Sequence, residues 1–139
     1  MVGVDGSEHA LAAVRWAARE ASLRHAAVRI VTAWEVPDYA LGGVAPDLLE
    51  SLEVGAVAAA ATAREAVRAS APDVEVQTSI VEGQAARALV EAARGAELLV
   101  VGSRGLGGFR SLLLGSVGQQ CAHHARCPVV IVRAERPRG

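Results

Sequence analysis

The sequence of 139 residues predicts a single α/β domain, residues 1–139, in which a five-stranded parallel sheet carries helices on both faces. Short apolar segments alternate along the chain with longer segments of helical periodicity, and this alternation is typical of an open parallel sheet of the Rossmann-like kind. The hydrophobic share of 52% is enough for a globular core and excludes a disordered chain. Right-handed crossovers leave few topologies for such a chain.

Each expected strand is a short apolar segment: 1–4, 28–36, 74–81, 97–102 and 127–133. Helices are expected between them, after Ser7 and over 48–70, 82–96 and 115–125. Ser7 is the expected N-cap of the first helix, and Gly95 is the expected end of the third. Residues 37–47 are expected to form a loop, and the tail from 134 to fray. Met1 coincides with the first strand, so either this strand is short or the natural chain begins upstream.

Composition excludes several classes of protein. The net charge is −1, all basic residues are scattered arginines, and aromatic residues make up 3% of the chain, which argues against nucleic-acid binding. Two cysteines are too few for a disulfide scaffold, and no apolar run is long enough to span a bilayer. With no signal peptide before the first strand, we expect a cytoplasmic protein without nucleic-acid or membrane partners.

The segment after the fourth strand is rich in glycine. Five glycines lie between residues 102 and 115, directly after an apolar run. Glycine permits the backbone conformations in which several N–H groups converge on a phosphate, and it has no Cβ to prevent close approach. Gly115 and Ser116 open the next helix, whose N-terminus favours an anion. Arg104 and Arg110 could add positive charge, or could be solvated loop residues.

Two well-known phosphate loops do not match this segment. A Walker A loop requires a lysine, and the chain has none. The dinucleotide fingerprint follows the first strand of its unit, and the spacing of the glycines does not fit it. A tight connection without a ligand remains the alternative.

The spacing Gly102-x2-Gly105-x9-Gly115-Ser116 resembles the ATP-binding motif of the universal stress protein family. "VDGS" at 4–7, "VEGQAARALVEAA" at 81–93 and "CPVVIV" at 127–132 resemble the same family, in the right order. The resemblance implies a strand order of 3-2-1-4-5, which makes the first and fourth strands neighbours. The "VDGS" loop and the glycine-rich loop would then face each other across the switch point.

The resemblance also implies ATP as the cofactor, accompanied or not by Mg²⁺, and a set of residues around it. Asp5 would lie near the ribose or a bound metal ion, Ala33 would offer its backbone to the adenine, and Val81 would line the same pocket. Asp5 is at the same time a plausible competitor of Ser7 for the helix cap. The other expected cofactor-binding residues are Gly3 and, for the phosphates, Gly102, Ser103, Arg104, Gly105, Leu106, Gly107, Gly108, Gly115, Ser116 and Val117.

Three functions are compatible with these residues. The first is an ATP-binding stress-response protein in which nucleotide occupancy regulates shape or partners. The second is a slow ATPase, for which Asp5 is the one evident acidic candidate and no catalytic residue is assigned. The third is a nucleotide-free interaction module, against which the retained glycine motif argues. The protein partner and the kind of stress are not encoded in any motif.

Two further expectations concern the C-terminal part of the chain. The fifth strand is an apolar sheet edge, which invites a homodimer, and the family commonly dimerises. "CAHHARC" at 121–127 does not have the spacing of a closed zinc site. Cys121 and Cys127 are expected to be small buried residues.

Overall fold

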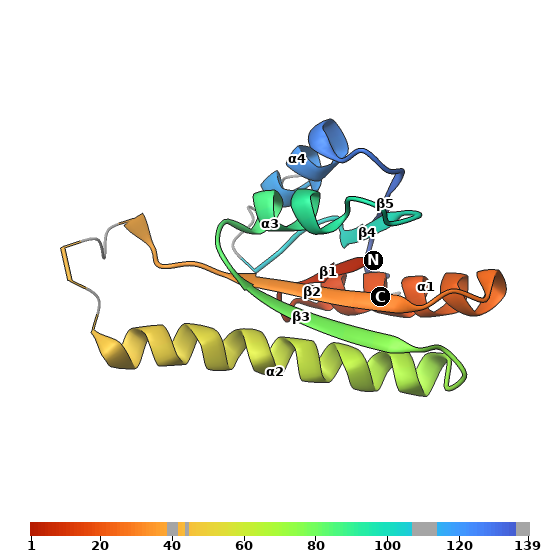
Figure 1. The fold of residues 1–139 in the computed structure, drawn as a ribbon, viewed down its shortest axis with the longest axis horizontal. Coiled ribbons are helices and arrows are strands. Elements are labelled where there is room, and N and C mark those ends of the chain that lie inside the picture. Colours follow the sequence, from red (N-terminus) through yellow and green to blue (C-terminus); the bar gives the residue numbers. More distant parts are fainter. Residues whose placement is uncertain (39–41, 44, 107–113, 136–139) are drawn as a thin grey trace.

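The computed structural model describes residues 1–38, 42–43, 45–106 and 114–135. Strands and helices alternate along the described chain (Figure 1). The predicted positions 39–41, 44, 107–113 and 136–139, which include Gly107, Gly108 and Arg110, lie outside the described residues. The elements are β1 (Val2–Val4), α1 (Glu8–Arg24), β2 (Val28–Trp34), α2 (Pro46–Ser70), β3 (Val76–Glu82), α3 (Ala85–Ala92), β4 (Leu99–Gly102), α4 (Ser116–His124) and β5 (Val129–Val132).

The sheet has five parallel strands in the order β3-β2-β1-β4-β5, which confirms the predicted fold class. Val2 pairs with Ile30 on β2 and with Val100 on β4, so β1 is the central strand despite its three residues. All three residues of β1 are buried. The two loops predicted to face each other therefore leave adjacent strands at the carboxyl edge of the sheet.

Helices cover both faces of the sheet (Figure 1). Residues alternate between the faces because successive side chains of a strand point in opposite directions. Ile30 therefore belongs to the core under α1 and α2, and Val31 to the core under α3 and α4. Both side chains are fully buried, and each such burial is worth about 1.5–3 kcal/mol.

Most helix ends agree with the prediction. The Oγ of Ser7 accepts a hydrogen bond from the N–H of Ala10 at 3.2 Å, so Ser7 is the N-cap of α1. The predicted end of α3 is wrong, because the helix ends at Ala92. Gly95 instead lies in the following turn with φ +81°, a conformation that favours glycine. Among the described residues, no helix has the length and apolar character needed to cross a membrane.

Candidate functional site

Four of the predicted residues lie in a row along the carboxyl edge of the sheet. Ala33 and Val81 are register partners on β2 and β3. Val4 pairs with Thr32, so Asp5, the next residue, reaches the level of Ala33. The register of β1 with β4 brings Ser103 to the same level on the other side. The row crosses four neighbouring strands and passes the topological switch point, where open α/β sheets bind ligands.

Asp5 connects the two loops that meet at this edge. Its Oδ1 accepts a hydrogen bond from the N–H of Ser7 at 2.9 Å, and its Oδ2 accepts one from the N–H of Leu106 at 3.2 Å. Gly105 lies directly against the carboxylate, since a Cβ there would be 2.6 Å from Oδ2. Gly6 allows the turn after Asp5 with φ +87°. Asp5 does not cap α1, because Ser7 does so.

The N-terminus of α4 has the features of an anion site. Gly115 is its N-cap and provides no side-chain hydrogen bond to the first turn, which contains Ser116 and Val117. The first N–H groups of a helix have no partner within the helix, and the helix dipole makes this end positive. No acidic residue stands in this first turn. Ser116 is exposed and Val117 half-buried, so the turn is accessible from solvent.

Gly115 lies against the backbone of the loop after β4. A Cβ at Gly115 would lie 3.4 Å from the Cα of Arg104 and 3.8 Å from the N of Gly105. The N–H of Gly115 donates to the carbonyl of Ser103 at 2.7 Å, which fastens α4 to the end of β4. A bare backbone cradle therefore stands beside the helix N-terminus. These features fit the phosphates of a nucleotide.

Gly102 has a packing role that the sequence did not reveal. A Cβ at Gly102 would meet the backbone carbon of His9 at 2.7 Å and its oxygen at 2.8 Å. The first turn of α1 thus rests directly on the end of β4. Gly3 likewise lies against Leu89, where a Cβ would be 2.7 Å from the side chain. Both glycines are explained by close packing, and their expected contacts with a cofactor stay predictions.

Ser103 is buried, and each of its polar groups has a partner within the protein. Its N–H donates to the carbonyl of Val132, its carbonyl accepts from Gly115, and its Oγ lies 3.1 Å from Nδ1 of His9. A direct role of Ser103 in phosphate binding would require one of these bonds to be given up. The neighbouring Leu106 is 75% exposed at the mouth of the loop.

A cavity of about 250 Å³ opens beside Asp5 between α1 and α2. The contribution of α2 to this cavity was not predicted, although the run of small residues in the helix is visible in the sequence. Because these side chains are small, α2 leaves space next to the end of β1. The cavity is lined by Val4, Asp5, Gly6, Ala10, Leu11, Gly55, Ala58, Ala59, Thr62 and Ala63.

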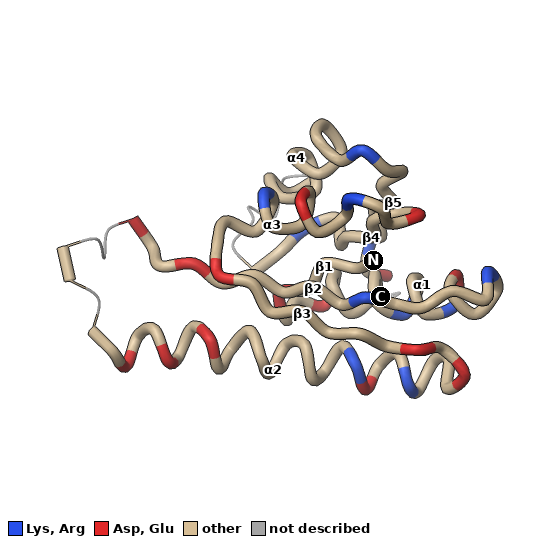
Figure 2. Tube along the Cα trace, in the orientation of Figure 1, with Lys and Arg blue, Asp and Glu red and all other residues tan. Residues whose placement is uncertain are grey.

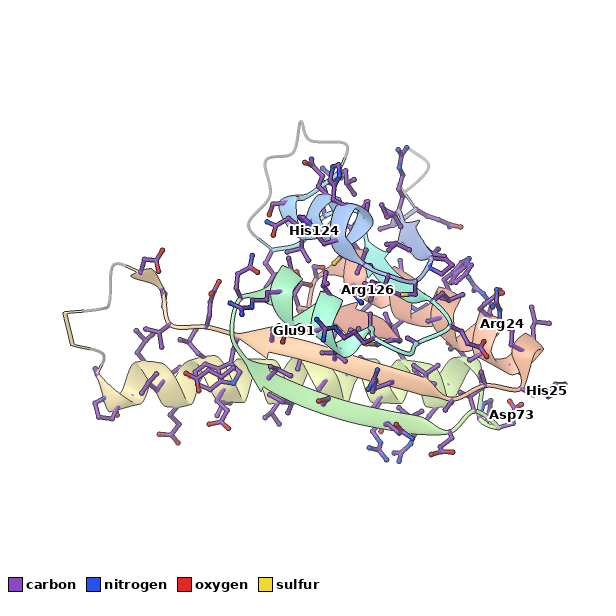
Figure 3. The ribbon with its side chains drawn as sticks, turned by 45° about the horizontal axis from the view of Figure 1, so that its top comes forward. Arg24, His25, Asp73, Glu91, His124 and Arg126 are labelled. Atoms are coloured by element: carbon purple, nitrogen blue, oxygen red, sulfur yellow. The ribbon has the colours of Figure 1, made fainter. Side chains whose placement is uncertain are left out.

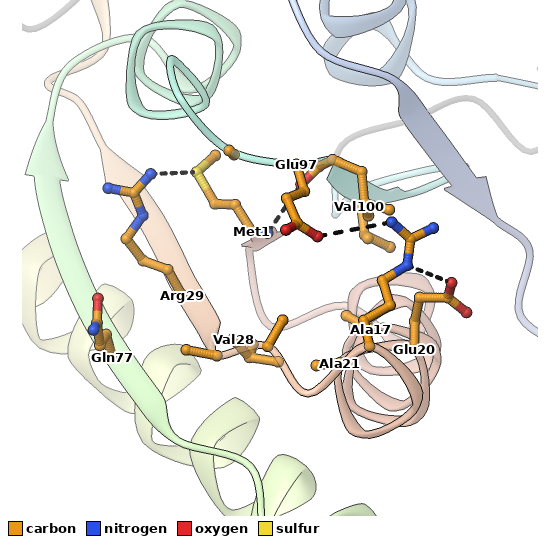
Figure 4. Close-up of a pocket in the computed structure, with 14 residues that line it drawn as sticks. Met1, Ala17, Glu20, Ala21, Val28, Arg29, Gln77, Glu97 and Val100 are labelled. Atoms are coloured by element: carbon orange, nitrogen blue, oxygen red, sulfur yellow. Dashed lines mark hydrogen bonds and ion pairs between the residues drawn. The ribbon is translucent and has the colours of Figure 1, made fainter.

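A second cavity, of about 200 Å³, lies at the opposite edge of the sheet (Figure 4). Arg24 forms ion pairs there with Glu20 at 2.8 Å and with Glu97 at 3.8 Å. The guanidinium of Arg29 donates to the carbonyl of Ala92. The charged groups of this cavity are therefore engaged with one another or with backbone, and they serve to join α1, β2 and the turn before β4.

Histidines and cysteines occur together in the segment after residue 120. Within the described part of the chain, no three His, Cys, Asp or Glu side chains lie close enough together to hold a metal ion. Cys121 is fully buried, and burial raises the pKa of its thiol to about 11. His124 lies at the exposed end of α4 (Figure 3). Cys127 is half-buried rather than fully buried as expected.

Charges on the described chain are spread over many elements (Figure 2).

This fold and this site define an α/β protein with a candidate phosphate-binding edge at its switch point. The model of the universal stress protein family matches residues 1–133, and the chain belongs to that family. A universal stress protein of Mycolicibacterium smegmatis is 39% identical over 140 residues, which are 97% of this chain and 48% of the relative. The chain therefore spans about half the length of that relative. A universal stress protein of Thermus aquaticus is 38% identical and is matched over 96% of both chains.

Solved structures support the same assignment. A universal stress protein in complex with cAMP has a TM-score of 0.75 and 32% sequence identity, over 96% of this chain and 95% of that one. A family protein from Arabidopsis thaliana with AMP bound has a TM-score of 0.69 over 96% of this chain and 91% of that one. At 18% identity, this second likeness concerns the fold alone.

Proposed function

We propose that this protein is a nucleotide-dependent regulatory protein of the stress response that binds an adenine nucleotide, with ATP as the expected ligand. The observation that carries the proposal is the pair of loops at the switch point, joined by Asp5 and followed by the bare N-terminus of α4. The universal stress protein solved with cAMP supports the ligand class. Its fold and 32% identity make an adenine nucleotide the first ligand to test.

The nucleotide would lie along the row of residues at the carboxyl edge. Its phosphates would accept hydrogen bonds from N–H groups of the loop after β4 and of the first turn of α4. Asp5 would face the ribose hydroxyl groups, because a carboxylate accepts hydrogen bonds from hydroxyls and repels phosphates. The backbone of Ala33 and the side chain of Val81 would border the adenine.

Mg²⁺ fits this arrangement in one way. Magnesium is commonly held by one or two carboxylates together with phosphate oxygens and water. Asp5 would supply the carboxylate, and the nucleotide would supply the remaining charged ligands. A carboxylate has about four acceptor sites, so Asp5 could hold the ion while it keeps the bond from the N–H of Leu106.

We also propose a homodimer formed along β5 and a cytoplasmic location. Val129–Val132 are all partly exposed, β5 is an edge of the sheet, and unpaired apolar edges associate readily. Both cysteines of the described chain are free thiols, which suits a reducing compartment. Sedimentation of the wild type beside Val130→Asp tests the dimer, since a charge at the edge should give a monomer. A wild type that sediments as a monomer contradicts it.

Calorimetric titration with ATP, AMP and cAMP tests the proposed function. Gly115→Ala should weaken binding at least tenfold, since a methyl group would fill the cradle beside the N-terminus of α4. Gly42→Ala is the matched control, because a Cβ there meets nothing within 4 Å. Failure of all three nucleotides to bind the wild type would refute the proposal. Hydrogen exchange of residues 102–106 and 114–116 should slow on binding.

A further inference from the structure

We infer that His9 is a pH-sensitive positioning residue that couples the loop after β4 to the chain after β5. The hydrogen bond that joins His9 to the chain after β5 can form only while the imidazole is neutral. The inference about the contact stands on the structure alone, and its consequence for ligand binding rests on the proposed function.

His9 lies in the first turn of α1 and joins two distant segments through a single ring atom. Its Nδ1 is 3.1 Å from the Oγ of Ser103 and accepts from the N–H of Ala134 at 3.3 Å. A backbone N–H can only donate, so Nδ1 must carry a lone pair and the ring proton must be on Nε2. The observed geometry therefore requires the neutral tautomer.

The contact reaches the candidate site through Ser103. That residue receives the N-terminus of α4 through its carbonyl and is bound to Val132 of β5 through its N–H. The backbone of His9 also rests on Gly102. His9 therefore contacts Ser103, the residue whose backbone is hydrogen-bonded both to the N-terminus of α4 and to β5.

Protonation of the ring affects the two partners differently. With a proton on Nδ1, the ring would donate to Ser103, whose hydroxyl can change from donor to acceptor. The N–H of Ala134 cannot make that change, so it would face another N–H and lose its bond. Acidification should consequently release the chain after β5 while the contact with Ser103 persists. Histidine is the side-chain type that most readily changes its charge between pH 5 and 8, which sets the range of the test.

Charged groups near these contacts are of both signs. The first turn of α4 and β4 itself contribute none. Because both signs are present on the neighbouring segments, the response is expected to come from the loss of a specific hydrogen bond rather than from a general change of charge. The nearest charged residues along the chain are Asp5 and Glu8 before His9, Arg104 beside Ser103, and Arg133 and Glu135 on either side of Ala134.

The test compares the wild type with His9→Asn and His9→Ala between pH 8 and pH 5.5. The Oδ1 of an asparagine can take the place of Nδ1 and accepts at every pH, whereas alanine has no acceptor. Hydrogen exchange at the Ala134 amide, corrected for its intrinsic pH dependence, is followed by NMR. The amide of Ala125, which donates to the carbonyl of Cys121, is the internal control.

In the wild type, protection of Ala134 should fall about two- to tenfold on acidification, the fold-change that corresponds to one hydrogen bond. It should stay constant in His9→Asn and be low at both pH values in His9→Ala. Equal pH profiles for the wild type and His9→Asn would overturn the inference. ATP affinity measured on the same samples should fall more with acid in the wild type than in His9→Asn, since protonation of the terminal phosphate affects both proteins alike. An absence of ATP binding at pH 8 would refute the proposed function and leave the exchange result to decide on His9.

Discussion

Gly102→Ala should destabilise the protein because it separates α1 from β4. The added Cβ would lie 2.7 Å from the backbone carbon of His9 and 2.8 Å from its oxygen. Ordinary contacts begin near 3.4 Å, and a backbone cannot rotate out of the way as a side chain can. The first turn of α1 must therefore move, and the bond between His9 and Ser103 must lengthen.

The magnitude follows from two opposing effects. Inserting a methyl group into a packed interior costs about 1–3 kcal/mol. Alanine in a strand regains about 0.5–1 kcal/mol of backbone entropy relative to glycine. We expect a net loss of about 1–2 kcal/mol in the free energy of unfolding, or a decrease of about 2–8 °C in Tm for a domain of this size.

Urea unfolding of Gly102→Ala and Gly115→Ala measures this difference. Gly115 has φ −71° and a nearest contact of 3.4 Å, so alanine fits its conformation and should change stability by less than about 1 kcal/mol. Nucleotide affinity should respond in the opposite order, with a larger loss in Gly115→Ala than in Gly102→Ala. Wild-type stability in Gly102→Ala, or equal losses in both variants, would refute the reasoning.

Three further predictions concern other parts of the molecule. Gly3→Ala should cost about 1–3 kcal/mol, and in a double-mutant cycle with Leu89→Ala the two costs should not add, since the added methyl meets the removed side chain. Asp5→Ala should speed hydrogen exchange at Leu106 and lower stability by about 1–2 kcal/mol by removing two hydrogen bonds; unchanged exchange would contradict the bridge between the loops. Because the thiol pKa of Cys121 is raised in the folded state, its contribution to stability is complete below pH 9 and lost as the pH rises through about 11. Urea unfolding under reducing conditions should show a smaller loss over this range for Cys121→Ala, and a thiol reagent should modify Cys127 before Cys121 in the native protein.

Local sequence patterns determined the elements and most of their ends. Periodicity located the strands and helices, and Ser7 was recognisable as a cap from its position before a helical segment. The end of α3 was misjudged because a glycine in the left-handed conformation suits both a helix end and the turn that follows it. The strand order came from a resemblance to a family rather than from any pattern within the chain.

The tertiary structure alone decided which groups meet. His9 is 94 residues from Ser103 and 125 from Ala134, and Asp5 is 101 residues from Leu106. Residue type and spacing along the chain encode local conformation, because they act through neighbours a few positions away. Contacts between distant segments depend instead on how the helices rest on the sheet. The sequence therefore suggested a ligand contact for Gly102, which stays a prediction, but did not reveal that α1 lies against β4 at this residue.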